Sequence, residues 1–131
     1  MLRTFKVEDN PTLLKNLAAT LEELCNAKII ADADAQREAE LWLTQNRSAW
    51  DVAIIDLFLR EGTGLEVLNV CAARKPGQKV VVLSNYATPA IKDACLARGA
   101  NAVFDKSTQL EEFIDFCSSA KPVHASESRA N

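Results

Sequence analysis

Five side chains that could take part in chemistry stand at the ends of short segments rich in apolar residues. Three are carboxylates: Glu8 and Asp9 after the first such segment, and Asp56 after a later one. A hydroxyl, Ser84, and an ammonium group, Lys106, occupy the same relative place further along the chain. Carboxylates can hold a hard metal ion or act as nucleophiles, depending on what lies beside them. The sequence therefore offers a coherent reaction site if the fold brings these five residues together.

Three carboxylates at one site need a cation beside them. Two unit charges about 4 Å apart repel by about 4 kcal/mol at an effective dielectric of 20, so Glu8, Asp9 and Asp56 would stay together with a cation in place or with one member protonated. The one histidine, His124, lies near the carboxyl end. With oxygen ligands alone, Mg²⁺ is the expected ion, with Mn²⁺ or Ca²⁺ as alternatives.

The same side chains suit acyl-phosphate chemistry. In that chemistry Asp56 attacks phosphorus, Mg²⁺ and Lys106 neutralise the equatorial oxygens, and Ser84 donates a hydrogen bond to one of them.

The elements that must position these residues alternate between strand and helix patterns. We expect strands at residues 4–7, 27–31, 52–55, 79–83 and 101–104, each followed by a helix with an inward apolar stripe. Asn10 and Thr88 each precede a proline, which predicts an N-cap. Gly99 is expected to end the fourth helix, and Thr108 and Glu111 form an expected capping box for the last one.

Five βα units with short connections predict an α/β fold with a doubly wound, five-stranded parallel sheet, helices on both faces and right-handed crossovers. A sheet of this size suits the flavodoxin-like strand order 2-1-3-4-5, in which the switch point lies between the first and third strands. Those strands end at Glu8-Asp9 and at Asp56. The topology alone thus brings the three carboxylates to one crevice.

Composition limits the classes of protein that the chain can represent. Its 131 residues suit one domain at residues 1–118, followed by a tail at 119–131 that we expect to be disordered. A net charge of -3 argues against direct nucleic-acid binding. No apolar run reaches the ~20 residues of a membrane span, and the start has no signal-peptide pattern, so we expect a cytoplasmic protein. The four cysteines are expected to be free, packed thiols.

Several segments in order resemble the receiver domain of two-component response regulators, the CheY-like family. They are residues 7–10, 54–59 with 62–65, 82–85 and 104–107. The resemblance implies a signalling switch rather than an enzyme, phosphorylated on Asp56 by a phosphohistidine of a sensor histidine kinase or phosphotransfer protein. It also implies Mg²⁺ on Glu8, Asp9, Asp56 and the backbone carbonyl of Phe58. Ser84 and Lys106 would be the switch and charge-sensing residues.

Some positions depart from the usual pattern of that family. Arg60 and Ser107 stand where prolines are common, and Val103 stands where the switch aromatic is usual, with Phe104 one residue later. These changes bear on coupled switching and leave the phosphoacceptor site intact. Tyr86, two residues after Ser84, is a candidate for shielding the phosphoryl group from water, which predicts slow autodephosphorylation.

The expected protein is a stand-alone receiver domain that signals through a downstream protein partner. In the family, the structural change that follows phosphorylation usually occurs on the surface of the fourth helix, fifth strand and fifth helix, here residues 90–99 and 110–117. A homodimer would form through the same surface. An alternative is a receiver-like interaction module that works without phosphorylation. A phosphatase of the haloacid-dehalogenase kind would need an aspartate at Phe58, and no nucleotide-binding glycine motif occurs.

Overall fold

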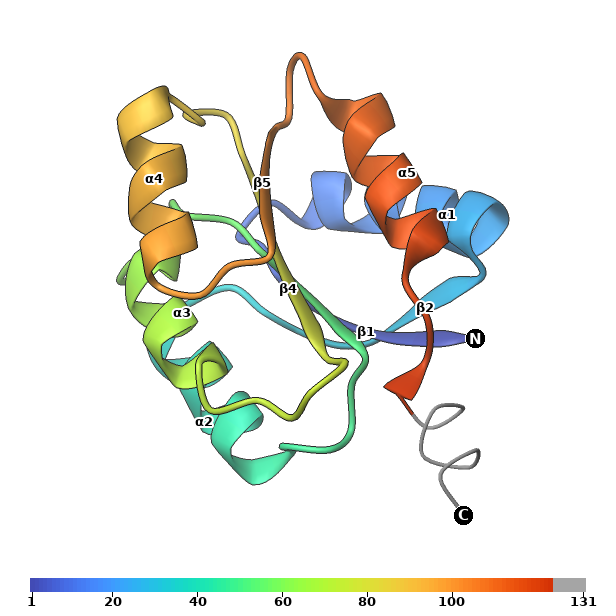
Figure 1. Cartoon of the computed structure of the whole chain (residues 1–131), viewed down its shortest axis with the longest axis horizontal. Coiled ribbons are helices and arrows are strands. Elements are labelled where there is room, and N and C mark those ends of the chain that lie inside the picture. The colour runs from blue at the N-terminus through green and yellow to red at the C-terminus, as the bar shows by residue number, and fades with distance from the viewer. Residues whose placement is uncertain (124–131) are drawn as a thin grey trace.

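The structure, a computed structural model, describes residues 1–123, in which five strands alternate with five helices (Figure 1). The strands are β1 (Leu2–Val7), β2 (Ala27–Ala33), β3 (Val52–Ile55), β4 (Lys79–Ser84) and β5 (Ala102–Asp105). The helices are α1 (Pro11–Cys25), α2 (Gln36–Gln45), α3 (Gly64–Cys71), α4 (Pro89–Ala97) and α5 (Leu110–Ser119). Every predicted element is present. Within residues 1–123 no helix is long and apolar enough to cross a membrane.

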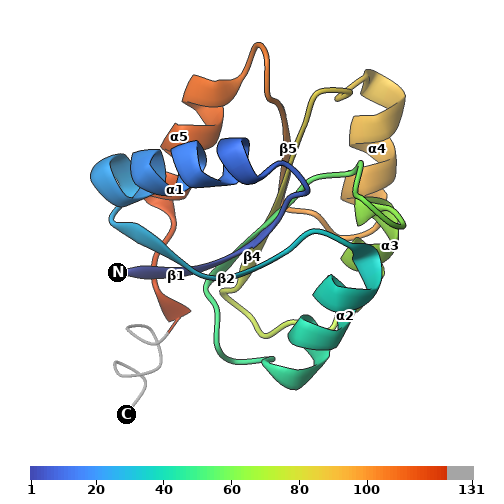
Figure 2. The same ribbon diagram turned by 180° about the vertical axis from the view of Figure 1, so that it is seen from behind.

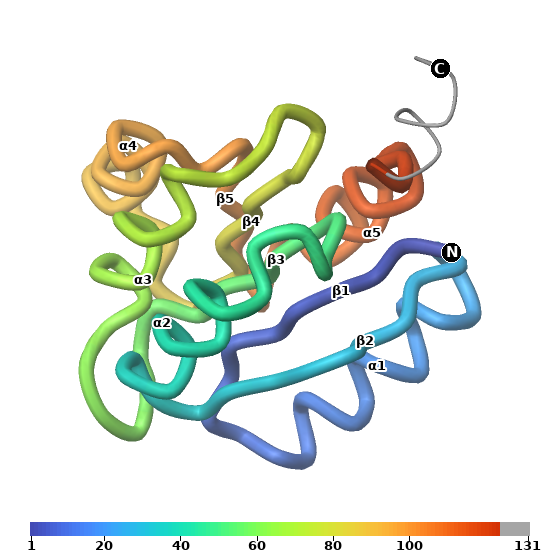
Figure 3. Tube along the Cα trace, turned by 90° about the horizontal axis from the view of Figure 1, so that it is seen from below, coloured from blue at the N-terminus to red at the C-terminus, as the bar shows by residue number. Residues whose placement is uncertain are grey.

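The strands form one parallel sheet in the order β2-β1-β3-β4-β5, which confirms the predicted topology. Figures 1 and 2 show α1 and α5 on one face of this sheet and α2, α3 and α4 on the other. Figure 3 shows the N-terminus beside the turn that joins α1 to β2, where the amide N–H of Leu2 donates to the carbonyl of Asn26 at 2.9 Å.

Both faces of the central strands are buried, as a doubly covered parallel sheet requires. Ile54 and Val81 belong to the apolar core under α1 and α5. Ile55 and Val82 belong to the core under α2, α3 and α4. Burial of each such side chain contributes about 1.5–3 kcal/mol relative to exposure, so the two cores fix the sheet between its helices.

The expected caps of the first and fourth helices are present, whereas the expected capping box is wrong. The side chains of Asn10 and Thr88 accept hydrogen bonds from the first turns of α1 and α4, and Gly99 follows α4 with a φ of +98°. Helix α5 instead begins after Gln109, which makes no side-chain cap. In the turn before the helix, the carboxylate of Asp105 accepts the N–H groups of residues 107 and 108 at 2.7 and 3.2 Å.

Asp51, a buried carboxylate paired with Arg3, ties the last described residue to the opposite end of the sheet from Asp56. Asp51, at the start of β3, accepts hydrogen bonds from the backbone and side chain of Arg3 and from the N–H of Val123. Val123 is 8% exposed, so this part of the expected tail packs on the domain instead of leaving it. Residues 124–131 lie outside the described part, and their expected disorder stays a prediction.

We expect Asp51→Asn to lower the free energy of unfolding by about 2–4 kcal/mol at pH 7, because a buried charged acceptor of hydrogen bonds from Arg3 and Val123 is lost. Urea unfolding measures this. Asp34→Asn is the matched control, because the pair between Asp34 and Arg60 is 3.0 Å long but exposed, and it should leave stability almost unchanged.

The stabilisation by Asp51 should depend on pH. Burial raises the pKa of Asp51, but the hydrogen bonds from Arg3 and Val123 outweigh it and hold the pKa below its usual value of 3.8. The contribution is therefore complete above that unfolded value and is lost as the pH falls through the lower folded value. If the difference in the free energy of unfolding between wild type and Asp51→Asn stays constant down to about pH 2, this assignment is contradicted.

Candidate functional site

The site lies where the chain leaves β1 and β3 at their carboxyl ends. After β1 the chain enters α1 on one face of the sheet, and after β3 it enters α3 on the other face (Figures 1 and 2). The two connections therefore diverge, and this divergence is what creates a crevice at a switch point. A cleft of about 190 Å³ occupies it. Its lining residues are Glu8, Asp9, Asn10, Leu13, Asp56, Phe58, Asn85, Tyr86 and Lys106.

Gly64 allows the chain after Asp56 to fold back closely. The N–H of Gly64 donates to the carbonyl of Leu57 at 3.0 Å, and Phe58 pairs with Thr63 in a short antiparallel bridge. A Cβ atom at Gly64 would clash with the backbone carbonyl of Asp56. The loop from Asp56 to α3 therefore depends on the absence of a side chain at this position.

Lys106 joins the two buried carboxylates across the cleft. Its Nζ lies 2.9 Å from Oε1 of Glu8 and 2.9 Å from Oδ2 of Asp56. The carboxylates are 3% and 5% exposed, respectively. The other oxygen of Asp56 accepts the N–H of Phe58 at 3.3 Å. The structure thus brings together Glu8, Asp56 and Lys106, although Lys106 is 98 residues from Glu8 and 50 residues from Asp56 along the chain.

A second lysine, which the sequence analysis did not single out, lies beneath this cluster. Lys6 is fully buried in β1, and its Nζ lies 3.1 Å from Oε1 of Glu8 and 3.2 Å from the carbonyl of Val7. A signal was present in the sequence: residues two apart on a strand point to the same face, and a lysine in a doubly covered strand needs a buried acceptor. Lys6 and Glu8 satisfy each other in this way.

Burial and the two lysines shift the pKa values of the cluster in different directions. Burial raises the pKa of Glu8, but the charges of Lys6 and Lys106 outweigh it and leave that pKa lowered. At Asp56 burial dominates over Lys106, and Glu8 adds to it, so the pKa of Asp56 is raised. Burial lowers the pKa of Lys6, whereas the two carboxylates raise the pKa of Lys106 against burial.

The carboxylates have the arrangement of a metal site. One oxygen each from Glu8, Asp9 and Asp56 can be chosen so that all three lie within 4.8 Å of one another. Glu8 and Asp56 are buried, and Asp9 is exposed. A set of hard oxygen donors open to solvent on one side suits Mg²⁺, which keeps several of its waters.

Ser84 and the aromatic residues lie around the cluster rather than in it. Ser84 is buried, and its Oγ accepts the N–H of Tyr86 at 3.3 Å. Tyr86 is 59% exposed and stacks edge-on against Phe58, with ring centroids 4.9 Å apart. Val103 is buried in the core under α4, whereas the ring of Phe104 packs edge-on against Phe113 of α5. Phe104 therefore faces α5 and lies away from the cleft.

Comparison with known proteins identifies the family. A family model of the response regulator receiver domain matches residues 5–117. The chain belongs to this family. Among solved structures, the response regulator domain of Thermotoga maritima CheB superposes with a TM-score of 0.75 at 20% identity, covering 93% of this chain and 99% of that one. The chain therefore has the CheY-like receiver fold, and receiver domains are signalling switches.

Two further relatives bear on the site and on the rest of the protein. The photosynthetic apparatus regulatory protein RegA of Rhodobacter capsulatus is 33% identical over 83% of this chain and 57% of its own length. The receiver domain of the sensor histidine kinase PA1611 of Pseudomonas aeruginosa holds a magnesium ion in its active-site cleft. It has a TM-score of 0.73 at 19% identity and covers 91% of this chain and 96% of that one. The chain spans about half the length of the curated relatives it matches, and stand-alone status stays a prediction.

Proposed function

We propose that the chain accepts a phosphoryl group on Asp56 and passes the signal to a protein partner. The observation that supports this most directly is the position of Lys106, whose single ammonium group contacts both Asp56 and Glu8 at 2.9 Å. A cation between the nucleophile and a neighbouring carboxylate can stabilise the negative charge on the oxygens of a phosphoryl group during transfer to Asp56. The donor would be a phosphohistidine of a sensor histidine kinase or phosphotransfer protein, in the cytoplasm.

Asp56 can carry out the transfer from the cleft. One carboxylate oxygen forms a bond to phosphorus while the bond from phosphorus to the donor imidazole nitrogen breaks, and the imidazole leaves with that electron pair. After transfer, a dianionic phosphoryl group would lie beside Lys106, which now contacts the free carboxylate of Asp56. Because this group adds roughly -1.5 to -2 charge, the ammonium group is expected to turn from Glu8 toward it.

Mg²⁺ is the proposed cofactor. Glu8, Asp9 and Asp56, with the backbone carbonyl of Phe58, would hold it, and when bound it supplies positive charge to the phosphoryl oxygens. Asp9 is the freest of the three carboxylates to do so, because it is exposed. Glu8 already accepts hydrogen bonds from both lysines through Oε1, whereas its Oε2 accepts one from the N–H of Asn10 at 3.4 Å, so Oε2 is the proposed ligand atom.

Ser84 and Tyr86 are the proposed link from the phosphoryl group to the surface. The hydroxyl of Ser84 now accepts the N–H of Tyr86, and donation to a phosphoryl oxygen would require it to turn toward the cleft. That movement would reach Tyr86 and α4 directly. The surface of α4, β5 and α5 is accordingly the proposed site for a downstream protein, or for a homodimer.

The alternative, an interaction module that ignores phosphorylation, has one observation in its favour. Val103 occupies the buried position on β5, and Phe104 is held against α5 by edge-on contacts with Phe113 and Phe116 at 6.2 and 5.9 Å. No aromatic side chain of β5 is therefore placed to follow Ser84. The intact acid cluster and Lys106 favour the phosphoacceptor function.

Mass spectrometry after incubation with acetyl phosphate tests the proposal. We expect wild type to gain one phosphoryl group in the presence of Mg²⁺, because the carboxylate of Asp56 lines the cleft beside Lys106. Asp56→Asn should gain none, and chelation of Mg²⁺ should prevent the gain in wild type. A folded wild-type protein that stays unmodified would contradict the proposal and favour the phosphorylation-independent module.

The lifetime of the phosphorylated form tests the role of Tyr86. Its ring and that of Phe58 stand beside the cleft, where they would hinder the approach of water to the phosphoryl group. We therefore expect Tyr86→Ala to lose phosphate several times faster than wild type, as followed by mass spectrometry after removal of acetyl phosphate. Leu96→Ala, an equally simple truncation of an exposed side chain on α4, serves as control. If all three proteins lose phosphate at the same rate, Tyr86 does not shield the phosphoryl group from water.

A further inference from the structure

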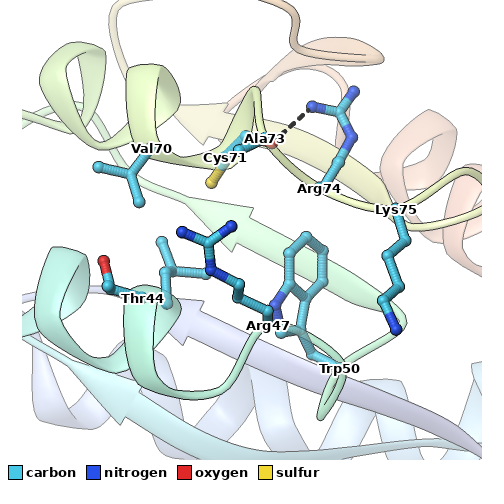
Figure 4. A pocket seen from close by; sticks show the side chains of 9 residues that line it. Thr44, Arg47, Trp50, Val70, Cys71, Ala73, Arg74 and Lys75 are labelled. Carbon is cyan, nitrogen blue, oxygen red and sulfur yellow. Dashed lines mark hydrogen bonds between the residues drawn. The ribbon is translucent and has the colours of Figure 1, made fainter.

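A second cavity lies at the opposite end of the sheet from Asp56, between α2 and α3. It has a volume of about 120 Å³ and opens to solvent on one side. Figure 4 shows the side chains around it, which come from the end of α2, the segment before β3, and the end of α3 with the turn that follows. The lining residues are Leu43, Thr44, Arg47, Trp50, Val70, Cys71, Ala73, Arg74 and Lys75.

The wall of this cavity combines an apolar floor with three cations and no carboxylate. Leu43, Trp50 and Val70 supply apolar surface. Within residues 1–123, the side chains of Arg47 and Lys75 form no ion pair. Positive charge beside an apolar cavity without a neutralising partner favours an occupant that carries a negative charge.

Arg74 is held in place by neutral groups alone. Its guanidinium donates to the carbonyls of Cys71 at 3.1 Å, Gln78 at 3.0 Å and Gly99 at 2.7 Å. These acceptors fix the side chain without cancelling its charge. Burial also raises the pKa of the Cys71 thiol to about 12, so this wall adds no negative charge that would repel an anion.

Trp50 places an unused hydrogen-bond donor on the same wall. Its side chain is 2% exposed, and its Nε1 is the one buried side-chain nitrogen or oxygen in residues 1–123 without a hydrogen-bond partner. Figure 4 shows the indole ring and the Arg47 side chain next to each other, with the indole nitrogen on the side of the ring toward Arg47. Buried donors without a partner are uncommon in folded proteins and call for an explanation.

We propose that this cavity binds a small organic anion, a carboxylate with one ring or a short apolar chain. Its apolar part would lie against Leu43 and Val70, and its carboxylate would accept the N–H of Trp50 and pair with Arg47 and Lys75. The size agrees, since an apolar cavity of about 150 Å³ is known to take benzene, and the open side of this cavity leaves room for the part of the ligand away from Trp50. The inference does not depend on phosphorylation of Asp56, because the cavity lies at the other end of the sheet.

A nitrogen–proton NMR titration with sodium benzoate tests this site. The indole N–H resonance of Trp50 should move along a saturable curve as the carboxylate becomes its acceptor. Benzyl alcohol, which has the same ring without the charge, should bind at least about fivefold more weakly, because it gains little from the two cations.

Two double variants distinguish the cavity from general attraction to a positive surface. Arg47→Gln with Lys75→Gln should weaken benzoate binding at least about fivefold. Lys15→Gln with Lys28→Gln removes the same charge from exposed positions on α1 and β2 and should leave binding unchanged. An indole resonance that fails to move, or equal weakening by both pairs, would overturn the proposal.

Discussion

The architecture of the site depends on one electrostatic requirement: two carboxylates buried at a sheet edge must be held by cations from the chain itself. Glu8 and Asp56 directly follow the neighbouring strands β1 and β3 and are almost fully buried. Such a pair would repel strongly in an environment of low dielectric. Lys106 contacts both carboxylates from above, and Lys6 contacts Glu8 from within β1. The cluster can therefore exist in the folded protein before any metal ion or phosphoryl group is bound.

The fold provides this arrangement through its topology. Strands β1 and β3 are neighbours, but their following helices lie on opposite faces, so the ends of the strands are left open to ligands. The two apolar cores hold the strands in register, and Gly64 lets the loop after Asp56 turn back under it. Lys106 then comes from the turn after β5, which is two strands away from β3, and closes the cluster. Movement of the Lys106 ammonium group is the simplest way in which a phosphoryl group on Asp56 could alter the surface of α4, β5 and α5.

Much of this could be predicted from the sequence because it depends on local patterns. Apolar runs gave the strands, proline after Asn10 or Thr88 gave two helix starts, and alternation of strands and helices gave the sheet order. From the sheet order followed the meeting of Glu8 with Asp56. The start of the last helix did not follow its local pattern, because α5 begins after Gln109, one residue beyond the predicted cap at Thr108.

Other features depend on contacts that no local pattern contains. The contact between Lys6 and Glu8 could be predicted only with the knowledge that helices cover both faces of β1. The packing of Val123 depends on Asp51, which is 72 residues away in the chain. The side of the sheet taken by Phe104 follows from the strand register between β4 and β5, which turns Val103 toward α4 and Phe104 toward α5.

A double-mutant cycle on Lys6 and Glu8 tests most directly whether the acidic cluster depends on the internal cations. Urea unfolding would be measured for wild type, Lys6→Met, Glu8→Gln and the double variant. The account predicts that Lys6→Met costs about 2–4 kcal/mol in wild type, because it leaves a buried carboxylate with one cation fewer, and far less in the Glu8→Gln background. An equal cost in both backgrounds would show that Lys6 does not stabilise Glu8 and would contradict the account.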